Sequence, residues 1–84
     1  MLGGIYMLFE GNICKVRDIL ISEIKKGCVS HLVDDITTEE FIYNTRLILD
    51  LLEELEVRIN NDELDLKIAV YENPMGSLYY EEVE

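Results

Sequence analysis

Histidine and cysteine, on which many catalytic and metal sites depend, are scarce in this sequence. It has one histidine, His31, and two cysteines among its 84 residues. It contains no nucleophile elbow, no phosphate-binding glycine loop and no paired His/Glu helix motif. General-base catalysis would therefore require His31 itself or a carboxylate with a shifted pKa. We expect a protein that is not an enzyme, and a carboxylate- or metal-dependent enzyme is the least favoured class.

The two cysteines, Cys14 and Cys28, are too few for a disulfide framework. Cys14 lies on a predicted helix and Cys28 just beyond its end, so a rise of 1.5 Å per residue would separate them by about 21 Å. A disulfide cannot bridge that distance, and we expect reduced thiols in an intracellular protein. Cys28 and His31 have the spacing of half a zinc site, but a second Cys/His pair is absent. The sequence therefore predicts neither a metal nor another cofactor.

Long apolar segments are absent as well. The apolar opening, Met1–Phe9, has about nine residues, whereas a membrane helix needs roughly 20. It also lacks the basic start and the cleavage site of a signal peptide. We expect one small cytoplasmic domain, residues 1–84, that does not enter a membrane. A domain of this size buries only about 60–65% of its unfolded surface.

Basic residues are few, because seven lysines and arginines stand against 18 acidic residues, and the net charge is −11. The imbalance is concentrated in one part of the chain. Residues 1–33 carry three acids and four bases, a net charge of +1, whereas residues 34–84 carry fifteen acids and three bases, a net charge of −12. Such a field repels nucleic acid and anionic lipid and attracts basic surfaces. We therefore expect no direct binding to nucleic acid, and a protein partner with a basic surface.

The strongest signal that is present is an amphipathic helix from Thr38 to Ile59. Thr37 and Glu40 form a capping box at its start. Its apolar line recurs at helical spacing and comprises Phe41, Thr45, Ile48, Leu52, Leu55 and Ile59. We expect Ile48 and Leu52 to be buried at the middle of the helix. Roughly 22 residues make about 33 Å of helix, as long as a small domain is wide.

A helix of this length extends beyond what a sheet of two or three short strands can cover. Its uncovered apolar positions, Leu47 and Leu51, are predicted to pair with a symmetry mate in a two-fold contact. The hydrophobic content of 49% in so short a chain supports the same expectation of a homodimer. On the charged flank, Glu54 stands four residues before Arg58, a spacing that favours an ion pair within the helix.

A first helix is predicted from Ile13 to Lys26. Asn12 is its N-cap, and Gly27 is placed as the left-handed residue that ends it. The buried line of this helix comprises Ile13, Val16, Leu20 and Ile24. Residues 28–36 then form either one extra helical turn or an extended connection, and we favour a structured connection.

The C-terminal part predicts a β-hairpin. Apolar and polar residues alternate from Leu64 to Tyr71, which is typical of a strand. Residues 73–76, Asn-Pro-Met-Gly, supply a turn, and residues 77–83 form the returning strand. Met1–Phe9 contains a further possible strand, although Met and Leu suit a helix equally well. The fold class is α+β, with two amphipathic helices packed on a small antiparallel sheet, in the order β-α-α-β-β or α-α-β-β.

The candidate partner-binding residues are acidic and aromatic side chains of the long helix and the hairpin: Glu53, Glu54, Tyr71, Glu72, Tyr79, Tyr80, Glu81 and Glu82. Tyrosine offers a large contact area at low entropic cost, and carboxylates engage lysine and arginine. The plainer interpretation, favoured for any single tyrosine, is that one covers the helices while the others shield the sheet backbone.

Two functional classes are about equally favoured. The first is a small acidic inhibitor that mimics nucleic acid and covers a basic surface of a nucleic-acid-binding protein, as phage antagonists and immunity proteins do. The second is a homo-oligomeric adaptor or regulator whose acidity only keeps it dissolved. Carboxylates gathered on one face would favour the first class, and a large apolar self-contact would favour the second.

Overall fold

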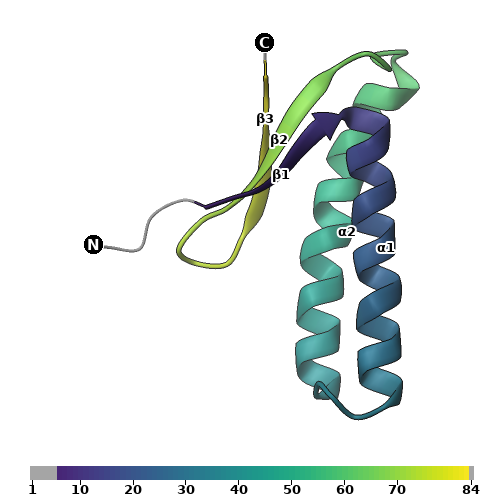
Figure 1. The fold of residues 1–84 in the computed structure, drawn as a ribbon, viewed down its shortest axis with the longest axis vertical. Helices are drawn as coiled ribbons and strands as arrows, with labels where there is room; N and C mark the ends of the chain where they lie inside the picture. Colours follow the sequence, from purple (N-terminus) through teal and green to yellow (C-terminus); the bar gives the residue numbers. More distant parts are fainter. Residues whose placement is uncertain (1–5, 84) are drawn as a thin grey trace.

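The computed structural model describes residues 6–83 and has five elements (Figure 1). These are β1 (Tyr6–Asn12), α1 (Ile13–Leu32), α2 (Thr38–Asn60), β2 (Lys67–Glu72) and β3 (Leu78–Glu82). The predicted α+β class and the C-terminal hairpin are confirmed, and the order is β-α-α-β-β. The strands form one antiparallel sheet with β2 between β1 and β3.

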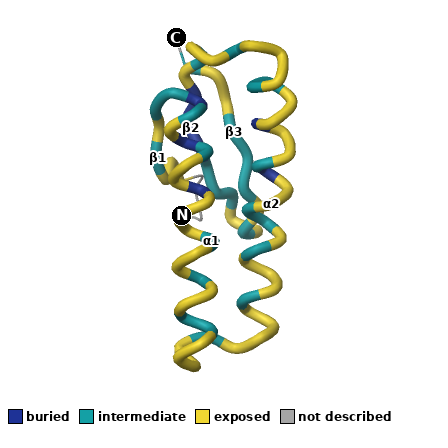
Figure 2. The backbone as a smooth tube through the Cα atoms, turned by 90° about the vertical axis from the view of Figure 1, so that its right-hand side faces the viewer, coloured by how far each residue is buried: buried dark blue, intermediate teal, exposed yellow. Residues whose placement is uncertain are grey.

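The sheet covers only one half of one side of the helix pair (Figure 1). The helices lie side by side and run on well beyond the sheet to the connection between them. Buried positions gather where the sheet lies on the helices, while the far half of the pair is exposed or half-buried (Figure 2). The described part of the chain measures 39 × 34 × 16 Å, and the sheet and the helix pair form two layers that lie beside one another in Figure 1.

The first strand is longer than the sequence predicts. It was expected to end at Phe9, but β1 continues to Asn12 and passes directly into α1. The backbone N–H of Ile13 donates to the carbonyl of Leu66 at 2.8 Å, which fixes this junction against the segment before β2. A bulge between Met7 and Phe9 shifts the register with β2. Residues 1–5 of the predicted opening strand lie outside the described residues.

Helix α1 begins as predicted and ends six residues later than predicted. The Asn12 side chain accepts a hydrogen bond from the Cys14 N–H at 2.8 Å, which confirms the N-cap. Gly27 does not end the helix. A Cβ built on Gly27 would lie 3.8 Å from the Phe41 ring, so this glycine sits inside α1 where α1 faces α2. Of the two alternatives for residues 28–36, the extra helical turn is therefore the one that is present.

Both helices end on an aspartate in the left-handed conformation. Asp34 has a φ of 61° and its N–H donates to the His31 carbonyl, while the next N–H reaches back to the Ser30 carbonyl. Asp62, with a φ of 64°, follows α2 in the same arrangement. This is the Schellman motif, in which the last free carbonyls of the helix are satisfied. At the other end of α2, the predicted capping box of Thr37 and Glu40 is confirmed.

The core forms where the two helices meet the central strand. Its buried residues are Ile13, Val16, Leu20, Leu51, Leu55, Ile68, Ala69 and Val70. The expectation that Ile48 and Leu52 are buried is wrong, because both are only half-buried at the margin of this cluster. Leu52 lies about 100° round the helix from Leu51. Leu55 of the predicted line is buried as expected, together with Leu51 beside it. The sheet packs over these two residues, so the buried stripe is displaced from Ile48 and Leu52 toward Leu51.

The central strand starts three residues later than its alternation predicts. Residues 64 and 65 form a turn, and β2 begins at Lys67. Ile68 and Val70 belong to the core cluster beneath the sheet. Ala69, between them in the strand, points to the other face of the sheet and is also fully buried. In the register it lies between Glu10 of β1 and Glu81 of β3. The middle of β2 is thus covered on both faces.

Gly27→Ala is expected to stabilise the fold by about 0.5–1 kcal/mol, because alanine suits a helix interior better than glycine. The new methyl group would meet the Phe41 ring at an ordinary contact distance. Urea unfolding measures the change. The matched control is Gly76→Ala, where a φ of 88° should make alanine destabilising by about 1 kcal/mol or more. A loss of stability in Gly27→Ala would restore the interpretation of Gly27 as a helix terminator.

Leu55→Ala is expected to lower the free energy of unfolding by about 2–5 kcal/mol, because it removes a fully buried side chain from the core. A small domain can lose most of its stability by such a change. Leu52→Ala, one turn earlier and half-buried, is the matched control and should cost clearly less. Equal losses from the two variants would contradict the observed position of the buried stripe.

Candidate functional site

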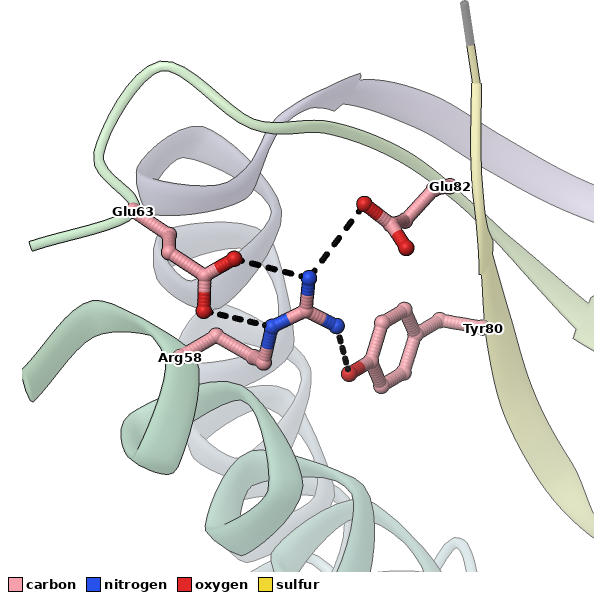
Figure 3. Close-up of polar contacts among 4 residues, drawn as sticks. All are labelled: Arg58, Glu63, Tyr80 and Glu82. Carbon is pink, nitrogen blue, oxygen red and sulfur yellow. Dashed lines mark hydrogen bonds and ion pairs between the residues drawn. The ribbon is translucent and has the colours of Figure 1, made fainter. Parts of the chain in front are cut away.

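Arg58, in the last turn of α2, connects three parts of the fold (Figure 3). Its Nε and Nη2 donate to the two carboxylate oxygens of Glu63, at 2.7 and 2.9 Å. Its Nη1 donates to the Tyr80 hydroxyl at 3.1 Å. The carboxylate of Glu82 completes the cluster, 3.2 Å from Nη2. The end of α2, the turn that follows it and the edge strand β3 are thereby held together by one guanidinium group.

The bidentate geometry has an electrostatic consequence for both partners. The hydrogen bond to Glu63, with a smaller contribution from Tyr80, raises the pKa of Arg58 above its ordinary value. The same hydrogen bond lowers the pKa of Glu63 below 4.5. The side chains are 26% and 38% exposed, so the pair lies at the surface and is partly screened by water. Arg58 is a fixed cation, and Glu63 is ionised at neutral pH.

An open hollow of about 610 Å³ lies beside Arg58, and we call it the acidic hollow. It is lined by Glu54, Arg58, Tyr80, Glu81 and Glu82. The structure therefore brings together four of the predicted partner-binding residues, from α2 and β3. Among residues 6–83, Glu54 and Glu81 take part in no ion pair. The spacing of Glu54 and Arg58 predicted such a pair, but Arg58 is engaged by Glu63 and Glu82 instead.

The three candidate tyrosines do not form one surface. Tyr80 packs at the edge of the core and binds Arg58, so it faces the helices. Tyr71 and Tyr79 are partners across β2 and β3, and their rings stack with centroids 5.5 Å apart. Because neighbouring residues of a strand point to opposite faces, this pair lies on the outer face of the sheet. The plainer interpretation, one tyrosine covering the helices, describes Tyr80.

The other candidates lie apart from the acidic hollow. Glu53 lines a separate hollow on α2. Glu72 and Leu47 line an apolar groove of about 290 Å³ between the sheet edge and the helices. Leu51 is wrongly assigned to self-association, because it is 1% exposed inside the core of the single chain. Leu47 remains half-buried in the groove.

The thiols and the histidine are also separated. Cys14 is half-buried and Cys28 is exposed, and both are free. His31 stacks on the Phe41 ring at 5.0 Å, and its Nε2 lies 3.0 Å from the Thr38 hydroxyl. These contacts tie the end of α1 to the start of α2. Among residues 6–83, no group of three or more His, Cys, Asp or Glu side chains is placed to hold a metal ion.

Arg58 is the residue of this candidate site that the sequence analysis did not include among the partner-binding residues. Its partners Glu63 and Tyr80 lie beyond the helix, and the helical spacing drew attention to Glu54 instead. Within residues 6–83, neither helix is long and apolar enough to cross a membrane. Comparison of the chain with protein-family models, curated proteins and solved structures gave no match.

Glu63→Gln is expected to destabilise the fold at pH 7 and to flatten its loss of stability in acid. The lowered pKa of Glu63 means that its contribution is complete above pH 4.5 and is lost as the pH falls through the folded-state pKa. Urea unfolding at a series of pH values from about 7 to 3 measures this. Glu54→Gln, one turn before Arg58, is the matched control and should keep the acid dependence of the parent protein. Identical pH profiles for Glu63→Gln and the parent would contradict the assignment.

Proposed function

We propose that this protein is a small acidic binding module that covers a basic surface of a nucleic-acid-binding protein, as an inhibitor or decoy, and that it is not an enzyme. The observation that carries the proposal is the acidic hollow, an open surface lined by Glu54, Glu81 and Glu82. It lies in the most acidic part of the chain. Residues 50–84 carry eleven acids and two bases, a net charge of −9.

Arg58 supports binding by ordering the hollow. It fixes Glu82 and the Tyr80 hydroxyl by direct contacts, so these groups need little further ordering when a partner arrives. Glu54 and Glu81 are exposed, and no ion pair within residues 6–83 engages them. These exposed carboxylates, together with the ordered Glu82, suit lysine and arginine side chains that would otherwise contact phosphates.

The sheet offers a second contact area, on the face of β3 opposite to the one that carries Tyr80. β3 is an edge strand, so one side of its backbone is not paired within the sheet. The stacked pair of Tyr71 and Tyr79 lies on the outer face of the same strands. Aromatic side chains of this kind contribute most of the binding energy in many interfaces. The partner-binding surface proposed here is the acidic hollow together with this pair.

Self-association as an adaptor is the second candidate, and a different observation favours it. Both helices expose large apolar side chains on the side away from the sheet, including Leu32 at 80% and Ile42 at 52%. These exposed apolar side chains do not indicate a nucleic-acid-binding partner.

The decoy proposal predicts a binding that salt weakens and that charge reversal in the hollow abolishes. The immobilised protein should capture basic nucleic-acid-binding proteins from a cell extract, and less of them as salt rises from about 50 to 500 mM. The variant with Glu54→Lys and Glu81→Lys should lose this capture. A purified captured protein should also lose affinity for a labelled oligonucleotide, measured by fluorescence anisotropy, when this protein is added.

The matched control reverses Glu10→Lys and Asp35→Lys, which changes the net charge equally on β1 and the α1–α2 connection. This variant should retain most of the capture, and urea unfolding should show that both variants fold. Glu82 is left in place because it pairs with Arg58. A partner that binds equally well in high salt, or that keeps its oligonucleotide in the complex, would rule out the decoy and favour the adaptor.

A further inference from the structure

Large apolar side chains are exposed on the side of the helix pair that faces away from the sheet, beside the charged Arg46, Asp50 and Glu53. We call this side the back face and define it by Ile21, Cys28 and Leu32 of α1 and by Ile42 and Leu49 of α2. All five are exposed, Ile21 at 39% and Leu49 at 48%. Ile42 and Leu49 lie about 160–180° round α2 from the buried Leu51. The hollow that they line, of about 410 Å³, contains no residue of the sheet.

The back face has the spacing of a helix-packing seam. On α1, Cys14, Ile21 and Cys28 recur every seven residues. On α2, Ile42 and Leu49 are separated by the same interval. Thr45 and Leu52, at the intermediate positions, are half-buried, and Leu52 packs at the margin of the core. This alternation of three and four residues places knobs and holes where another helix can pack. The face is therefore suited to helices, and it runs along both elements.

The two helices, each taken as a whole, carry net charges of opposite sign. α1 carries Lys15, Arg17, Lys25 and Lys26 against Asp18 and Glu23, a net charge of +2. α2 carries six acids against Arg46 and Arg58, a net charge of −4. A two-fold axis that places α1 of one copy on α2 of the other matches these charges at both contacts. The same surface then contributes both the basic helix and the acidic helix, so it is complementary to itself, as an isologous interface requires.

We infer that a second copy of this chain packs on the back face, helix layer against helix layer, with α1 on the partner's α2. The resulting dimer has four layers, with the two sheets outside and four helices between them. The back face lies opposite the sheet, and Glu54 of the acidic hollow lies on another side of α2, about 140° from Leu49. The dimer therefore leaves the acidic hollow and the tyrosine pair of each copy accessible, and it does not depend on the decoy proposal.

Sedimentation equilibrium of the full chain from about 1 to 100 µM tests the dimer. We expect twice the mass of the 9.8 kDa chain. Leu49→Glu should raise the dissociation constant by roughly thirtyfold or more, because it buries a charge at the centre of the seam. The fold should survive, since Leu49 is exposed in the single chain; circular dichroism and urea unfolding of the monomeric variant check this. A 9.8 kDa monomer at every concentration overturns the proposal.

Leu8→Glu is the matched control, since Leu8 is 46% exposed on β1 and lines the groove that contains Leu47. It should leave the dimer intact. If Leu8→Glu dissociates the dimer and Leu49→Glu does not, the groove is the interface and the back-face proposal is wrong. The same conclusion follows if neither variant dissociates it.

The pairing of α1 with α2 has its own test. Arg17→Glu with Lys25→Glu makes α1 acidic, so it should weaken the dimer by placing acid opposite acid. Asp50→Lys with Glu53→Lys brings the net charge of α2 from −4 to 0, so it should weaken the dimer by removing the attraction to α1. A mixture of the two variants should associate more strongly than the variant with the acidic α1 does alone. An acidic α1 that dimerises as well as the parent would show that α1 meets α1 across the axis, which contradicts the proposed arrangement.

Discussion

The structure depends on a mismatch of length between its helices and its sheet. The 23 residues of α2 extend about 34 Å, whereas the seven residues of β1 span about 23 Å. A sheet of three such strands covers one side of the helix pair over one half only (Figures 1 and 2). Every further feature follows from this constraint, including the small core, the apolar back face and the need to fasten the sheet to the end of α2. Arg58 supplies that fastening, because its guanidinium reaches both the turn after the helix and β3.

Most of the fold follows from local signals that the sequence contains. A few consecutive residues are enough to predict each of three features, and all three are present: the N-cap at Asn12, the capping box at Thr37 and the hairpin. The predictions are wrong where a contact between residues far apart in the sequence determines the local structure. Gly27 has the position of a helix terminator, but its role is set by Phe41 on the other helix. The buried stripe of α2 is displaced toward Leu51 because the sheet packs on that side, and periodicity alone does not say from which side the core approaches.

The candidate site was predicted in its composition and not in its arrangement. The acidic and aromatic residues of the hairpin were identified, but strand alternation sends Tyr80 to the helices and Tyr79 to the outer face. The central cation was missed because its partners, Glu63 and Tyr80, are separated from it by a turn and by a strand. Helical spacing describes pairs within one element. It cannot indicate a cluster that three elements form only after folding.

The distribution of charge allows the two proposed contacts to coexist. Each copy carries a net charge of −11, so two copies repel one another at long range. The helix layer is where this repulsion is smallest, because α1 is basic and the acidic excess lies in residues 50–84 around the sheet and the end of α2. Salt screens long-range repulsion between copies and equally screens attraction to a basic partner. Salt also screens the attraction between α1 and α2 across the dimer, but it does not weaken the apolar contact of the back face. Rising ionic strength should therefore favour the dimer of this chain over its complex with a basic protein.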